Sequence, residues 1–167
     1  CAGQYLDLHF EQVERVTVAE YTRMIAGKTA ALLSASLAIG AALGGAAAPA
    51  VEAFAAAGTA LGLAFQAVDD ILGVWGEPTV TGKSAATDIL ARKKTLPVLH
   101  ALDWEREHGC TDLAALYARP LRPEDVPAVL ALLDRAGSRP FAEAWAGRQQ
   151  SQALQHLHAA GCAGPAL

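Results

Sequence analysis

Residues 65–76 read FQAVDDILGVWG and place two adjacent aspartates, Asp69 and Asp70, in an otherwise apolar run. A carboxylate in apolar surroundings costs free energy unless its charge is paired or bound to a metal ion. On a helix, Gln66, Asp69, Asp70 and Gly73 share one stripe, because they are spaced i, i+3, i+4 and i+7. Such acids suit Mg²⁺, which takes one or two carboxylates and completes its shell with water and phosphate. A solvated helix end remains the commoner explanation for an Asp pair taken alone.

The stretch that follows, TGKSAATDILARKKTLP at residues 81–97, adds Lys83, Asp88, Lys93 and Lys94. Lysine binds phosphate as a compact positive charge. Gly82 gives the loop freedom to close over a ligand. A solvated basic loop is the alternative for this stretch alone. The acid pair together with the Gly-Lys loop, a lone acid and a second lysine is far more specific than any one part.

Outward from this stretch, the hydrophobic pattern is helical nearly throughout, and no run shows the alternation of a strand. Thr17 and Glu20 stand at capping-box spacing, and Gly44 and Gly45 mark a helix end. We therefore predict a single all-α domain over residues 1–167. The helices are expected at residues 3–13, 17–45, about 49–75, from about 96 onward, 110–120, 122–137 and about 140–160.

Composition limits the possible partners. Hydrophobic residues make up 53% of the chain, above the ordinary range, so much surface is buried internally or against another chain. The net charge of -4 gives no electrostatic case for nucleic acid or an acidic membrane. The uncharged stretch 29–51 is long enough for a bilayer, but its small residues favour a tightly packed helix, and we expect no membrane span. Cys1, Cys110 and Cys162 lack metal spacing and indicate free thiols in the cytoplasm.

Four stretches, in order, resemble the trans-isoprenyl diphosphate synthases, also called polyprenyl synthetases. GQYLDL at 3–8 resembles the family's Gly-Gln-x-x-Asp helix, and residues 21–41 resemble its helix with a central Lys-Thr pair. Residues 65–83 resemble its second aspartate-rich motif and the loop that follows. Residues 87–102, TDILARKKTLPVLHAL, resemble the next segment. Beyond residue 103 the chain carries no motif.

The resemblance implies an isoprenoid-synthase-type helical bundle around a central cavity, where two aspartate-rich motifs hold Mg²⁺ on the diphosphate of an allylic substrate. Ionisation of that substrate and attack by isopentenyl diphosphate would give a longer prenyl diphosphate. By resemblance, Asp69 is a direct Mg²⁺ ligand, and Asp70, Asp7 and Asp88 support the metal shell. The resemblance also implies that Lys28, Lys83 and Lys93 bind the diphosphate, and that Lys28, Thr29 and Gln66 take part in catalysis. It places Gln4, Phe65 and Leu32 in the substrate pocket. Taken alone, Thr29 is equally explained as an ordinary helical threonine, and Phe65 as a core residue.

The sequence departs from the family pattern in two ways. Gly73 stands where the second motif commonly ends in Asp, and the first aspartate-rich motif is absent. We therefore expect an incomplete bundle, the C-terminal part of a synthase, that forms a homodimer or pairs with an N-terminal half. Two further functions stay open: a class I terpene cyclase on the same scaffold, and a non-catalytic subunit of a heteromeric prenyl synthase.

Overall fold

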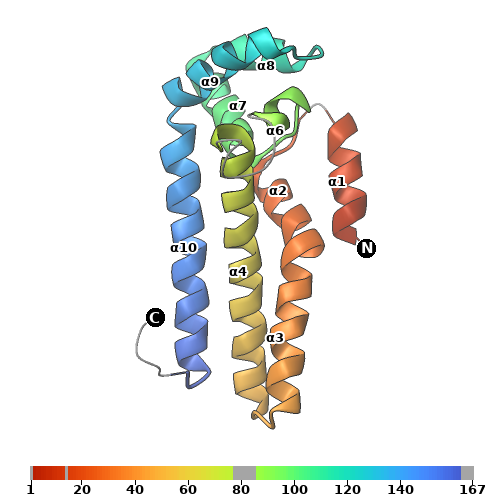
Figure 1. The fold of residues 1–167 in the computed structure, drawn as a ribbon, viewed down its shortest axis with the longest axis vertical. Coiled ribbons are helices and arrows are strands. Elements are labelled where there is room, and N and C mark those ends of the chain that lie inside the picture. Colours follow the sequence, from red (N-terminus) through yellow and green to blue (C-terminus); the bar gives the residue numbers. More distant parts are fainter. Residues whose placement is uncertain (1, 14, 77–85, 163–167) are drawn as a thin grey trace. The chain divides into compact units, whose positions relative to one another are not determined.

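The chain is helical in the computed structural model, which describes residues 2–13, 15–76 and 86–162 (Figure 1). No strand occurs within these ranges, so the predicted all-α class is confirmed. The elements are α1 (Ala2–Gln12), α2 (Val18–Ile25), the π-helical turn η1 (Ala26–Ala30), α3 (Ala31–Leu43), α4 (Ala48–Trp75), α6 (Thr87–Leu90), α7 (Leu96–His108), α8 (Asp112–Tyr117), the 3-10 turn η2 (Pro123–Asp125), α9 (Val126–Arg135) and α10 (Ser138–Ala159).

Contacts between these helices divide the chain into two compact units. The first unit contains residues 2–7, 22–66 and 145–162, and the second contains residues 8–13, 15–21, 67–76 and 86–144. The long helix α4 is continuous through residue 66, where one unit ends and the other begins. Whether residues 1–167 form a single domain, as the sequence predicts, stays a prediction.

The predicted helix signals operate at both ends of the 17–45 segment. The Thr17 N–H donates to Glu20 Oε2 at 2.9 Å, and the Glu20 N–H donates to Thr17 Oγ1 at 3.2 Å, which completes the capping box. At the other end, α3 stops before Gly44, and Gly45 takes a φ of 79°. The segment is not one uninterrupted α-helix, however, because the π-helical turn η1 separates α2 from α3.

Small residues bring α3 and α4 together in the first unit. A Cβ atom at Gly58 would lie 2.7 Å from the Ser34 Cα atom, and one at Gly62 would lie 2.4 Å from the Ala30 Cα atom. Ser34 Oγ also donates to the Ala55 carbonyl at 2.9 Å. The close approach predicted from the Ala- and Gly-rich composition is therefore confirmed for this pair of helices.

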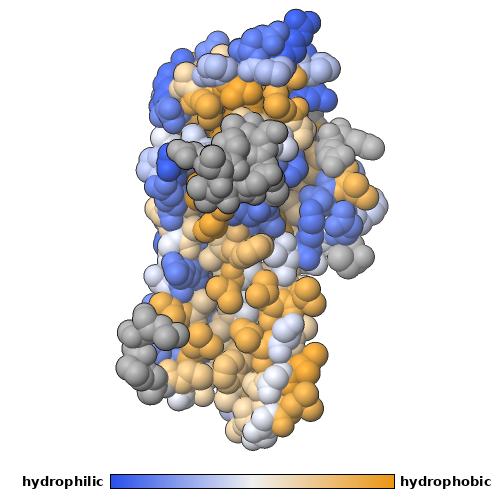
Figure 2. All heavy atoms as spheres, in the orientation of Figure 1, coloured by the Kyte–Doolittle hydropathy of each residue, from blue (hydrophilic) through white to orange (hydrophobic). Residues whose placement is uncertain are grey.

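The other side of α3 is exposed and apolar. Leu32, Ile39 and Leu43 keep 72%, 59% and 85% of their surface accessible, and no residue of α3 is buried. Figure 2 shows apolar residues gathered over α3 and the neighbouring part of α4. The first unit thus presents a large apolar face.

The core of the second unit fixes the end of α4 beside α6. Val74 on α4 and Ile89 on α6 belong to one buried cluster with residues of α7, α8 and α9. Ala86, which precedes α6, takes a left-handed φ of 57° and is also part of this cluster. The four-residue helix α6 was not predicted from the sequence, and it carries Asp88.

Two helical stretches, Val18–Leu43 and Ala48–Trp75, are long and apolar enough to cross a membrane by length and composition. Only 17% and 33% of their most apolar windows are buried within the structure. Core helices of soluble proteins pass the same test, so the absence of a membrane span stays a prediction.

Candidate functional site

Asp70 is held inside the second unit by two donors on the same oxygen. Its side chain is 4% exposed, and Oδ2 accepts a 2.5 Å hydrogen bond from Tyr21 Oη and a 2.8 Å bond from the Leu96 N–H. These bonds join the end of α4 to α2 and to the first residue of α7. Asp70 is thus placed to orient the neighbouring turn of α4, and its role in supporting a metal ion stays a prediction.

Asp88 forms an ion pair with Lys93 in the same unit. Lys93 Nζ lies 2.6 Å from Asp88 Oδ1, and the Asp88 side chain is almost fully buried. The hydrogen bond from Lys93 to Asp88 raises the pKa of the lysine. Partial burial lowers this pKa, and the negative charges of Asp88, Asp69 and Asp70 raise it. Burial raises the pKa of Tyr21, as do Asp70, Asp69 and Asp88. Three of the predicted acids therefore share one electrostatic environment.

A second group of predicted residues meets in the first unit. Lys28 Nζ lies 2.5 Å from Asp7 Oδ2, and both side chains are partly exposed. The approach depends on Gly3, which lies one turn before Asp7 on α1. A Cβ atom at Gly3 would lie 2.7 Å from the Lys28 Cα atom, so only glycine lets α1 pack on the η1 backbone this closely.

Thr29 and Gln66 also meet within the first unit. Thr29 Oγ1 donates to Gln66 Oε1 at 2.9 Å, across 37 residues of sequence. Thr29 lies in the π-helical turn η1, together with Lys28. π-turns inside helices are frequent at functional sites, because the wider turn re-aims side chains. The catalytic role of Thr29 and the alternative of an ordinary helical threonine both stay open.

The predicted pocket residues lie at the surface. Phe65 is 61% exposed and Leu32 is 72% exposed, so the alternative of a core role for Phe65 is wrong. Gln4 is exposed as well. Lys83 and most of its Gly-containing loop lie outside the described residues, so the structure does not test its assignment to the diphosphate.

The acids do not form a closed metal cage. Within residues 2–13, 15–76 and 86–162, no three His, Cys, Asp or Glu side chains cluster closely enough to hold a metal ion. Mg²⁺ needs fewer protein ligands than that, since water and phosphate oxygens usually fill most of its shell. Asp69 and Asp88 offer carboxylate oxygens, which suit Mg²⁺ better than softer metals.

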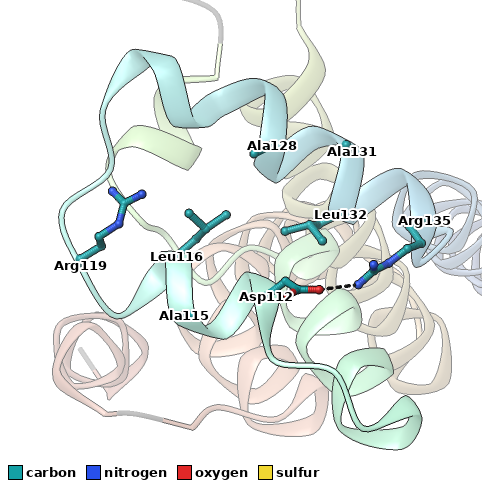
Figure 3. A pocket seen from close by; sticks show the side chains of 8 residues that line it. All are labelled: Asp112, Ala115, Leu116, Arg119, Ala128, Ala131, Leu132 and Arg135. Atoms are coloured by element: carbon teal, nitrogen blue, oxygen red, sulfur yellow. Dashed lines mark hydrogen bonds and ion pairs between the residues drawn. The ribbon is translucent and has the colours of Figure 1, made fainter.

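A pocket of about 590 Å³ lies elsewhere in the second unit, between α8 and α9 (Figure 3). None of the predicted site residues lines it. Its two arginines are already paired: Arg135 with Asp112 at 3.1 Å, and Arg119 with Asp125 at 2.6 Å. The pocket thus offers no uncompensated charge among its lining residues, and the assignment of the functional site to the acids and lysines stays a prediction.

Sequence reasoning missed two side chains that organise the second unit. Tyr21 holds Asp70 from 49 residues away. Lys94 Nζ donates to the carbonyls of Phe10 and Val13, at 2.8 Å for Phe10, and so ties the end of α1 to the segment after α6. Lys94 was noted only as part of a basic stretch. No local pattern identifies either contact, since each partner is far away in the sequence.

Comparisons of the whole chain with known proteins point to one family. The family model described as polyprenyl synthetase matches residues 1–133. The chain is 43% identical over 159 residues to geranylgeranyl diphosphate synthase from Mycobacterium tuberculosis, covering 94% of this chain and 45% of that protein. It resembles the crystal structure of polyprenyl synthetase from Streptomyces coelicolor A3(2), with a TM-score of 0.82, 41% identity and coverage of 95% and 49%.

A further solved structure is geranylgeranyl pyrophosphate synthase from Corynebacterium glutamicum, complexed with isoprenyl diphosphate and magnesium. It matches with a TM-score of 0.85 and 29% identity, covering 95% of this chain and 45% of that one. The chain thus spans about half the length of the relatives it matches.

Proposed function

This chain belongs to the polyprenyl synthetase family, and from that premise we propose that it serves a prenyltransferase that joins an allylic diphosphate to isopentenyl diphosphate. The observation that carries the proposal is the 43% identity with a geranylgeranyl diphosphate synthase over nearly the whole chain. The predicted acids and lysines support it, because they lie within the matched residues 1–133.

The lysines stabilise the departing diphosphate. As the allylic C–O bond breaks, negative charge grows on the diphosphate oxygens, and a cation nearby favours the transition state more than the ground state. A lysine is protonated at neutral pH, and the hydrogen bond from Lys93 to Asp88 raises the pKa of Lys93 further. Lys28 is partly exposed beside Asp7 and is available in the same way. We assign Lys83 the same role from the sequence alone.

Mg²⁺ is the proposed cofactor, with Asp69 as its direct ligand and Asp70, Asp7 and Asp88 in support. Bound Mg²⁺ supplies Lewis-acid stabilisation of the diphosphate charge. The isoprenyl diphosphate and magnesium in the Corynebacterium glutamicum relative support this assignment. The hydrogen bonds from Tyr21 Oη and the Leu96 N–H fix the side chain of Asp70, so the turn that carries Asp69 is held before any ligand arrives.

The Thr29–Gln66 pair and the apolar side chains of Phe65 and Leu32 are proposed to lie beside the reacting carbons. Exclusion of water there protects the allylic cation from being quenched. The exposed apolar face of the first unit supports a pairing with a second copy or with an N-terminal half. We place the protein in the cytoplasm, because its cysteines show no disulfide or metal pattern.

The test is an assay of the full chain with Mg²⁺, an allylic diphosphate and labelled isopentenyl diphosphate. Longer labelled prenyl diphosphates support elongation. Cyclic hydrocarbons from the allylic substrate alone point to a terpene cyclase, and activity only after adding a second protein points to a non-catalytic subunit. The absence of any product under all three conditions contradicts the proposal.

Asp69→Ala is expected to lower turnover by orders of magnitude in the active form, since it removes the proposed direct ligand. Asp103→Ala is the matched control, because Asp103 pairs with Arg106 one turn away on α7 and is not among the predicted site residues. A near-normal rate for Asp69→Ala rules out the ligand assignment.

A further inference from the structure

Helix α6 ends in a pair of backbone hydrogen bonds that turn the chain back on itself. The Lys93 N–H donates to the Asp88 carbonyl at 2.9 Å, and the Arg92 N–H donates to the Ile89 carbonyl at 2.8 Å. Together these bonds form a Schellman motif, in which one residue past the helix takes a left-handed conformation. Arg92 is that residue, with a φ of 50°.

The same pair of bonds closes three other helices, which use glycine at the left-handed position. These glycines are Gly45 after α3, Gly109 after α7 and Gly161 after α10, with φ values of 79°, 66° and 86°. Glycine adopts this conformation without a steric penalty, whereas an L side chain there crowds the backbone. Arg92 therefore holds a strained backbone at the turn after α6. Strain of this kind is concentrated at functional sites, where the surrounding structure keeps it in place.

The side chain of Arg92 shows how the turn is kept in place. Its Nη1 donates to the carbonyl of Tyr117, the last residue of α8, at 3.3 Å. Helix α8 is itself fixed, because Leu113 is fully buried and Tyr117 packs against the same core cluster as Ile89. Arg92 thus joins the turn after α6 to a fixed point on the core of the second unit.

This turn determines where the ammonium group of Lys93 lies. A Schellman motif makes neighbours of the side chains at the two ends of its longer bond, here Lys93 and Asp88, and they form the 2.6 Å ion pair. The Lys93 side chain is 60% exposed, so packing alone does not hold it. Ordering a long side chain only when a ligand arrives costs affinity. A fixed turn removes part of that cost in advance.

We propose that residue 92 is a positioning residue of the diphosphate site, and that its left-handed backbone holds the Lys93 ammonium in place for the ligand. Residue 92 acts through Lys93 rather than on the substrate. The side-chain bond to α8 stabilises the strained turn, so arginine is tolerated where glycine would suit the backbone better. The inference rests on the proposed function, since that function supplies the diphosphate.

The test compares residues at position 92 that differ in their tolerance of the left-handed conformation. Arg92→Val disfavours it, because branched side chains are outliers at positive φ, and is expected to weaken Mg²⁺-dependent binding of inorganic pyrophosphate about threefold to tenfold. Arg92→Gly is the rescue variant, which adopts the turn freely and is expected to restore affinity to within about twofold of the parent. Isothermal titration of the full chain, with and without Mg²⁺, measures both. Residue 92 is exposed, so neither change disturbs the core.

Gly109→Val is the matched control. It places the same residue at the left-handed position of the α7 turn, where a Cβ atom meets nothing within 4 Å. Both valine variants are expected to lower Tm, because both strain a helix end. Only Arg92→Val is expected to weaken pyrophosphate binding, whereas a residue that served the fold alone would make the two variants alike.

NMR relaxation of labelled lysine side chains measures the positioning of Lys93 without a ligand. The Lys93 signal is assigned by its loss in Lys93→Arg. We expect the Lys93 side chain to move with a larger amplitude on the picosecond-to-nanosecond timescale in Arg92→Val than in the parent. In Arg92→Gly the amplitude is expected to return to that of the parent.

Two outcomes overturn the inference. The first is an Arg92→Val variant that keeps either the parent's affinity or the parent's Lys93 motion. The second is an Arg92→Gly variant that binds as weakly as Arg92→Val, because arginine would then act through its own charge and not through the turn. If the parent shows no Mg²⁺-dependent pyrophosphate binding, the proposed function fails, and the motion of Lys93 alone decides whether residue 92 positions the lysine.

Discussion

Tyr21 and Tyr117 both have a buried phenol oxygen, but they differ in hydrogen bonding. Tyr21 Oη donates to Asp70, whereas Tyr117 Oη meets no hydrogen-bond partner in the described part of the chain. Tyr21→Phe leaves a buried carboxylate one donor short, so we expect the free energy of unfolding to fall by about 1–3 kcal/mol. Tyr117→Phe removes an unpaired polar group and is expected to leave stability unchanged or raise it. Urea denaturation measures both, and equal losses contradict the bonding described.

The same two phenols predict how stability depends on alkaline pH. Burial raises the pKa of both above the ordinary value of 10.0, and the charge and hydrogen bond of Asp70 raise that of Tyr21 further. Their stabilising effect is complete below about pH 10. Above it, the unfolded chain loses phenolic protons that the folded chain keeps, so stability falls. We expect Tm to drop between about pH 10 and 11, and to drop less in Tyr21→Phe. Identical pH profiles for the two proteins contradict this prediction.

At the scale of elements, α3 and α4 approach closely because of glycine. A Cβ atom at Gly58 would lie 2.7 Å from both the Leu33 carbonyl oxygen and the Ser34 Cα atom, whereas one at Gly40 meets nothing within 4 Å. Gly58→Ala is therefore expected to destabilise by about 1–3 kcal/mol, because backbone has to move. Gly40→Ala is expected to stabilise by about 1 kcal/mol through helix propensity. Thermal unfolding followed by circular dichroism compares them, and a stabilising Gly58→Ala contradicts the packing.

The helices found by sequence and those missed differ for physical reasons. The limits of α4 and the start of α7 were predicted nearly to the residue, because apolar periodicity and Gly and Pro signals are local. Helix α6 has only four residues, too few to show a period. The π-helical turn η1 lies between two α-helices, and the apolar spacing of the sequence stays helical on both sides of it. The sequence pattern therefore does not distinguish it from a continuous α-helix.

The sequence identified candidate site residues, whose roles stay predictions, but it did not identify the contacts between them. Local spacing on α4 identified Asp69 and Asp70, and family resemblance supplied Lys28, Thr29 and Gln66. The partner of Asp70 lies 49 residues away, and that of Thr29 lies 37 residues away. Such contacts depend on how helices pack, which no local pattern encodes. Gly73 was noted as a departure from the motif, but its closeness to Asp88 required the structure, where a Cβ atom at residue 73 would lie 2.6 Å from Asp88 Cγ.

On the scale of the whole molecule, the apolar face of the first unit dominates the expected solution behaviour. The face consists of Leu32, Ile39 and Leu43 on α3 with Leu61 and Phe65 on α4, each at least 43% exposed. Exposed patches of this kind bind apolar dyes and other protein surfaces. The isolated 167-residue chain is therefore expected to bind an apolar fluorescent dye and to associate as its concentration rises.

Ile39→Gln/Leu43→Gln is expected to reduce both effects at little cost in stability, because no residue of α3 is buried and Gln is a good helix former. Leu154→Gln is the control, since Leu154 is 54% exposed on α10 and is not part of the α3–α4 face. Dye fluorescence and sedimentation velocity across a concentration series measure the two effects. The prediction fails if the parent chain stays monomeric and does not increase the fluorescence of the dye. It also fails if Leu154→Gln reduces both effects as strongly as Ile39→Gln/Leu43→Gln does.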